Sequence, residues 1–181
     1  MLLSAFLLCL PQQVGHDRYM INPDGEIMES AWFDSNENGN IDLWLAVKKD
    51  GHRYIQCYQQ DKQGGFPAAP TVNIGLHPAV VAWAVGNFSD AEEFPGADLI
   101  YTTRDSVALQ PFTGKRFTII HRGEEMFLDL PSSESAPLWR EVADMDGDGL
   151  DEILLPTQKG FLILRGDGTL VGEIPIPLPD A

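Results

Sequence analysis

Basic residues and cysteines are both scarce in this chain of 181 residues. Lys and Arg number 12 against 27 Asp and Glu, which gives a formal net charge of -15 at pH 7. This balance argues against nucleic acid and anionic membrane surfaces as partners, because both are polyanions that would repel the chain. The two cysteines, Cys9 and Cys57, are too few for a disulfide framework, and we expect Cys57 to be a small core residue.

The sequence also lacks an apolar run long enough to span a bilayer, so no membrane insertion is expected. Its N-terminal run, residues 1–10, is short and ends at Pro11-Gln12-Gln13. We interpret residues 1–15 as a signal peptide or as an apolar strand that packs on the domain, with a lipid anchor at Cys9 as a third reading. A basic leading segment and a small-x-small cleavage site are both missing. The signal reading predicts a secreted or cell-envelope protein.

Helical periodicity and catalytic motifs are the remaining absences. No stretch keeps a helical period, and 17 glycines with 13 prolines fit many turns. The four histidines are scattered without ligand spacing, and no serine lies in a Gly-x-Ser-x-Gly elbow. We therefore expect a non-catalytic, all-β protein with one domain over residues 16–181.

A repeated acidic loop is what the sequence does contain. The segments 34–42 and 144–152 align without a gap: side-chain oxygens occupy loop positions 1, 3, 5 and 9, glycine occupies position 6, and an apolar strand begins at position 10. A degenerate, longer copy begins at Asn87, 53 residues after Asp34 and 57 residues before Asp144. This spacing predicts three units of similar size, at about residues 20–75, 76–127 and 135–178.

Each unit contains apolar segments of strand length, separated by polar turns. One candidate strand precedes each loop and carries a tryptophan (Trp32, Trp83 or Trp139), a second follows the loop, and a third follows the next turn. A fourth strand is expected from about Phe66, Phe117 or Leu170. Four short antiparallel strands per unit predict about three blades of the β-propeller type.

The acidic loops are predicted calcium sites, because calcium takes six to eight oxygen ligands and glycine permits the reversal of the backbone around the ion. The acidic loops contain no histidine and no cysteine, which argues against zinc and copper as their ions. The first loop has two charges where the third has four, so its affinity should be lower. The longer middle loop, interrupted by residues 92–95, should bind weakly or not at all. The predicted ligands are Asp144, Asp146, Asp148, the carbonyl of Leu150 and Glu152 in the third loop, and Asp34, Asn36, Asn38, the carbonyl of Asn40 and Asp42 in the first.

Two other interpretations apply to acidic loops of this kind. An EF-hand requires a glutamate at position 12, where this chain has Leu45 and Leu155, and it also requires flanking helices. Acidic β-turns without an ion, in which Asp and Asn cap backbone groups, stay open as the alternative.

The third loop with its flanks, Val142 to Gly149 followed by Glu-Ile-Leu-Leu and by the turn Gly166 to Thr169, resembles the FG-GAP or VCBS repeat family. The first unit is similar through Asn38 to Leu43 and Gly64-Gly65-Phe66. The resemblance implies a calcium-stabilised β-propeller used in adhesion and ligand binding, with calcium on the residues named above. Such propellers normally close with about seven blades. Three units therefore imply a partial propeller or an open repeat stack.

Two functions follow as expectations. The first is a non-catalytic, calcium-stabilised extracellular module that binds a protein or a glycan. The alternative is a polysaccharide-binding or polysaccharide-active propeller, in which Trp32, Trp83 and Trp139 could form a platform for sugar rings, although we expect these residues in the core.

Overall fold

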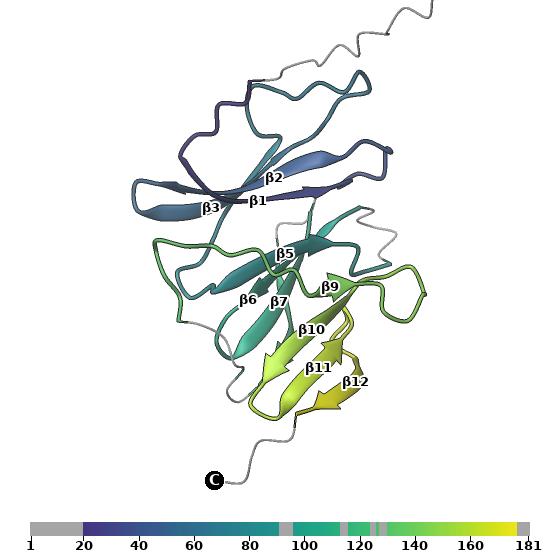
Figure 1. Cartoon of the computed structure of the whole chain (residues 1–181). Coiled ribbons are helices and arrows are strands. Elements are labelled where there is room, and N and C mark those ends of the chain that lie inside the picture. Colours follow the sequence, from purple (N-terminus) through teal and green to yellow (C-terminus); the bar gives the residue numbers. More distant parts are fainter. Residues whose placement is uncertain (1–19, 91–95, 113–115, 124–125, 127–129, 177–181) are drawn as a thin grey trace, which may run out of the picture.

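A computed structural model describes residues 20–90, 96–112, 116–123, 126 and 130–176. The predicted signal or apolar segment 1–15, Cys9 and the insertion 92–95 lie outside these residues. In the described part the chain is all-β, as predicted, and forms three antiparallel four-stranded sheets without a helix (Figure 1). No described helix could therefore cross a membrane.

Each sheet is built from four strands that neighbour one another in chain order. This is the arrangement expected from short strands joined by polar turns. The first sheet contains β1 (Glu26–Phe33), β2 (Asp42–Lys49), β3 (His52–Tyr58) and β4 (Val72–Gly75); the second contains β5 (Ala82–Gly86), β6 (Asp98–Thr102), β7 (Ser106–Pro111) and β8 (Thr118–Arg122); the third contains β9 (Val142–Ala143), β10 (Glu152–Thr157), β11 (Gly160–Leu164) and β12 (Leu170–Pro175).

The turn between β2 and β3 shows how local sequence sets the strand register. Lys49 pairs with His52, which leaves Asp50 and Gly51 as a two-residue hairpin loop. Both have positive φ, 49° and 77°, the combination that an Asp-Gly turn adopts most readily. The turn thereby fixes the register in which Val47 pairs with Tyr54 and Ala46 with Ile55.

Two strands differ from their predicted positions. The fourth strand of the first sheet begins at Val72 rather than near Phe66, because a loop containing Pro67 and Pro70 comes first. The strand expected over residues 138–143 is reduced to β9. The preceding backbone pairs with another sheet instead: Leu138 forms a parallel bridge with Trp83, and the Trp139 amide donates to the Trp83 carbonyl at 2.6 Å.

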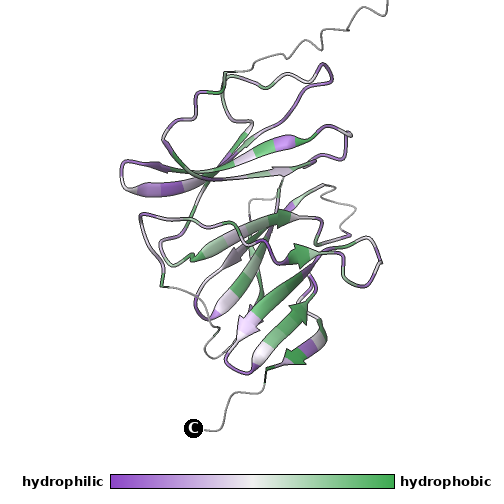
Figure 2. Cartoon of the chain, viewed as in Figure 1, coloured by the Kyte–Doolittle hydropathy of each residue, from purple (hydrophilic) through white to green (hydrophobic). Residues whose placement is uncertain are grey.

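The core lies between the sheets, which follow one another in an open row (Figures 1 and 2). Neighbouring residues of a strand face opposite sides, so Leu99 packs toward the first sheet and Ile100 toward the third. Trp44 and Trp83 are the largest buried side chains of the first interface, and Ile153 and Leu155 bring the third sheet against the second.

Cys57 is a buried core residue, as predicted. Burial raises the pKa of its thiol to about 12, so the group stays protonated at neutral pH. The described residues give it no disulfide partner.

Candidate metal centre

The three acidic loops occupy the same place in the three sheets. Each loop joins the first strand of its sheet to the second, and the second strand begins with a carboxylate that pairs with the last residue before the loop. These residues are Asp42 opposite Phe33, Asp98 opposite Gly86, and Glu152 opposite Ala143. All three carboxylate residues are fully buried, at 0% exposure, whereas most other residues of the first and third loops are exposed.

The first and third loops share one hydrogen-bond network. The side chain at position 1 accepts a hydrogen bond from the backbone amide of the glycine at position 6, and the side chain at position 3 accepts one from the backbone amide of position 5. The side chain at position 5 accepts a bond from the backbone amide of position 7, and the carboxylate at position 9 accepts one from the backbone amide of position 2. In the first loop these four distances are 2.7, 3.2, 2.8 and 3.0 Å. In the third they are 3.1, 3.1, 2.9 and 2.8 Å. The alignment made from the sequence therefore corresponds to a common loop conformation.

Two positions of each loop are left-handed. Gly39 and Gly149 at position 6 have φ of 84° and 94°, as their glycine predicts. Position 4 is also left-handed: it is Gly147 with φ 82° in the third loop but Glu37 with φ 55° in the first. The first loop thus adopts its conformation at the cost of a non-glycine residue in a disfavoured region.

The third loop gathers three acidic residues around one point. One carboxylate oxygen from each of Asp144, Asp146 and Glu152 lies within 4.8 Å of the others. The second carboxylate oxygen of Glu152, Oε1, is buried and has no hydrogen-bond partner, although Oε2 accepts from the Met145 amide. A buried carboxylate oxygen without a donor is costly unless a cation is near, so this arrangement suits a hard cation with oxygen ligands.

Arg165 is a residue of this centre that the loop pattern did not predict. It follows β11, and its guanidinium reaches across to the loop: Nη2 contacts Asp146 and lies 2.9 Å from Asp148 Oδ2, while Nε lies 3.6 Å from Glu152 Oε1. The hydrogen bond from Arg165 lowers the pKa of Asp146 and raises that of Arg165 itself. Asp148, one of the predicted third-loop ligands, contacts the arginine but does not belong to the trio of Asp144, Asp146 and Glu152.

The first loop offers a different environment, because its closing carboxylate is already satisfied. Asp42 Oδ2 accepts from the amide and hydroxyl of Ser35, and Oδ1 accepts from the Gln60 amide at 2.7 Å. The side-chain oxygens of the predicted ligands Asn36 and Asn38 each accept a hydrogen bond from a backbone amide of the loop. With Asp34 and Asp42 as its two ligand carboxylates, this loop supplies no acidic trio like that of the third.

The described ends of the middle loop contact both neighbouring loops: the Ala97 amide donates to the Ser35 carbonyl of the first loop at 3.0 Å, and Asn87 contacts the third. The backbone amide of Asn87 donates to Asp151 Oδ2 at 2.7 Å, and its side-chain amide donates to the Gly149 carbonyl at 2.9 Å. Ser89 donates to Asp98 at 2.7 Å. Burial raises the pKa of Asp98, an effect that the Ser89 hydrogen bond partly opposes. The polar side chains of Asn87 and Ser89 are thus engaged in contacts with protein groups.

The three repeat tryptophans do not form one platform. Trp83 lies in the core, as expected, and its Nε1 donates to the Ala136 carbonyl at 2.9 Å. The expectation of a core position is wrong for Trp32, which is 60% exposed and stacks edge-on with Phe66. The reason is strand alternation: Ala31 takes the inward face of β1 and Trp32 the outward one.

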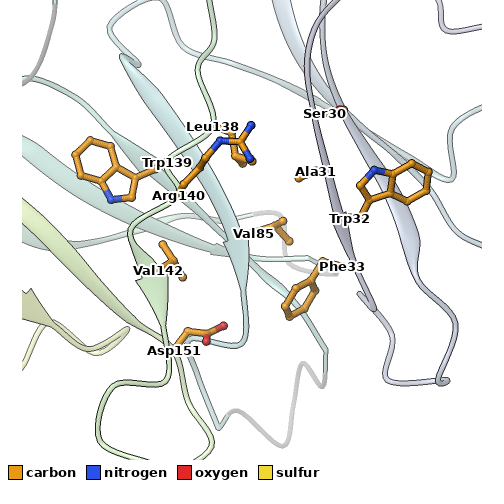
Figure 3. Close-up of a pocket in the computed structure, with 10 residues that line it drawn as sticks. All are labelled: Ser30, Ala31, Trp32, Phe33, Val85, Leu138, Trp139, Arg140, Val142 and Asp151. Atoms are coloured by element: carbon orange, nitrogen blue, oxygen red, sulfur yellow. The ribbon is translucent and has the colours of Figure 1, made fainter.

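A cavity of about 440 Å³ lies between β1, β5 and β9. Phe33, Val85 and Asp151 point toward it, whereas the indoles of Trp32 and Trp139 point away from it and from each other (Figure 3). The carboxylate of Asp151 is held by the Asn87 amide. The cavity therefore presents neither an aromatic sugar platform nor a free carboxylate pair.

The sequence matches no model of a known protein family, and no curated protein matches it. The function must therefore be argued from the geometry of the loops.

Proposed function

We propose that this chain is a non-catalytic β-repeat module of the FG-GAP or VCBS type, stabilised by a calcium ion in its third loop. The observation that carries the proposal is the buried Oε1 of Glu152, which accepts no hydrogen bond and lies beside Asp144 and Asp146. Calcium suits these ligands because it is a hard cation that binds carboxylate oxygens in flexible geometry. It would supply two positive charges to carboxylates that the single charge of Arg165 compensates only in part.

The ion would hold the third sheet where its ladder is weakest. β9 pairs with β10 through only two residue pairs, whereas β1 pairs with β2 over most of its eight residues. Asp144 follows β9 directly and Glu152 begins β10, so one ion on both would tie the two strands together. The role that follows is structural, with no switch of conformation in the sheet.

The site also favours a calcium-rich compartment. Calcium sites of extracellular modules bind in the range of about 10⁻⁴ to 10⁻³ M, which suits a partly exposed loop of this kind. A secreted or cell-envelope protein that binds a protein or glycan ligand would meet this condition. A polysaccharide-active propeller is the weaker candidate, because the tryptophans expected to carry it point in different directions.

Thermal unfolding with calcium and with EGTA tests the proposal. Calcium at about 100 times its Kd should stabilise the wild type by about 2.7 kcal/mol. For a chain of this size, that corresponds to an increase in Tm of roughly 5–10 °C. Asp146→Asn should lose most of the increase, because it removes one charged ligand.

Asp50→Asn is the matched control, since it removes the same charge from an exposed turn where Asn also tolerates positive φ. It should keep the full calcium response. An unchanged wild-type Tm in calcium would refute the calcium assignment.

A further inference from the structure

The guanidinium of Arg165 contacts the oxygens that a metal ion in the third loop would use. It contacts Asp146, lies 2.9 Å from Asp148 Oδ2, and brings Nε within 3.6 Å of Glu152 Oε1. Two of these three partners, Asp146 and Glu152, belong to the acidic trio. The arginine therefore provides a positive charge at the centre when no metal is bound.

An ion and this guanidinium cannot keep the same position. Calcium binds oxygen at about 2.3–2.6 Å, so it needs the space and the oxygen lone pairs that the arginine now uses. Two positive groups a few ångströms apart also repel strongly in a partly buried site. The Arg165 side chain is 36% exposed, so it has a route to solvent.

The first loop has no such arginine. Leu43 pairs with Tyr58 as Ile153 pairs with Leu164, so Gln59 is the counterpart of Arg165. The Gln59 side chain carries no charge, and the Gln59 backbone amide donates to Thr71 Oγ1 at 3.2 Å. Of these two loops, the arginine thus belongs to the one with four predicted ligand carboxylates.

We propose that Arg165 is a built-in counter-ion, which offsets part of the negative charge of the third loop in the metal-free protein and is displaced when calcium binds. This inference rests on the proposed calcium site. Arg165 lowers the apparent affinity of the loop, since each binding event must first break its ion pairs. It also keeps the carboxylates from repelling one another when calcium is scarce. Four carboxylates then need not give the tighter site that charge count alone predicts.

Calorimetric titration with calcium chloride tests the inference on wild type, Arg165→Gln and Arg140→Gln. Arg140→Gln is the control for the loss of one positive charge, because Arg140 is exposed and pairs with Glu29 away from the loop. Arg165→Gln should bind calcium roughly five- to tenfold more tightly than Arg140→Gln. Its Tm in EGTA should also be lower than that of the control.

Each outcome has a separate meaning. Equal affinity in the two variants, or weaker binding by Arg165→Gln, would overturn the counter-ion role while leaving the calcium site in place. Absence of binding in all three proteins would refute the proposed function itself. Arg165→Lys keeps the positive charge but can contact the carboxylates at only one point, so its affinity for calcium should lie between those of the wild type and Arg165→Gln. This variant tests the same inference if Arg165→Gln fails to fold.

Discussion

The first and third loops have the same backbone conformation, but their closing carboxylates are stabilised in different ways. In the first loop the closing carboxylate, Asp42, accepts three hydrogen bonds from protein donors. In the third, Glu152 accepts one and leaves its other oxygen to a cation. The same fold can therefore be closed by hydrogen bonds in one repeat and by a positive charge in another.

Replacement of the closing carboxylate in the first loop should give the largest effect on this comparison. Asp42→Ala leaves the donors at Ser35 and Gln60 without their buried acceptor, so the loss of stability should be about 3 kcal/mol. Because this carboxylate is satisfied without an ion, the loss should be equal in calcium and in EGTA. Chemical denaturation in both buffers measures it. A loss confined to the calcium buffer would show that the first loop depends on the ion as the third does.

Exchanges at loop position 4 should give smaller effects of opposite sign. Glu37→Gly relieves a left-handed non-glycine residue and should stabilise the protein by roughly 0.5–1 kcal/mol. Gly147→Ala creates that strain in the third loop and should destabilise it by about 1 kcal/mol, since an added Cβ meets no neighbour there. Urea denaturation of both variants in EGTA resolves the two effects. The same sign for both would mean that the two backbones differ.

Much of this architecture follows from local patterns in the sequence. The spacing of Asp, Asn and Gly predicts a loop conformation because each short side chain caps an amide two residues along, and the structure shows these bonds in both loops. The Asp50-Gly51 turn and the third strands follow equally from short-range chemistry.

The features that the sequence did not predict depend on distant contacts. Arg165 is 19 residues from Asp146, and only the pairing of β10 with β11 brings it to the loop. Trp32 is exposed because one step along a strand changes the face that a side chain occupies. Asp98 is buried as Asp42 and Glu152 are, and each of the three precedes an apolar strand, but the longer middle loop obscures this alignment in the sequence.

A crystal structure of the protein grown with calcium chloride tests the central claim most directly. The account predicts one ion in the third loop, about 2.3–2.6 Å from oxygens of Asp144, Asp146 and Glu152, with Arg165 withdrawn from the carboxylates. A loop that still holds Arg165 against Asp146 and Asp148 at millimolar calcium, with no ion among the three acidic residues, would contradict it.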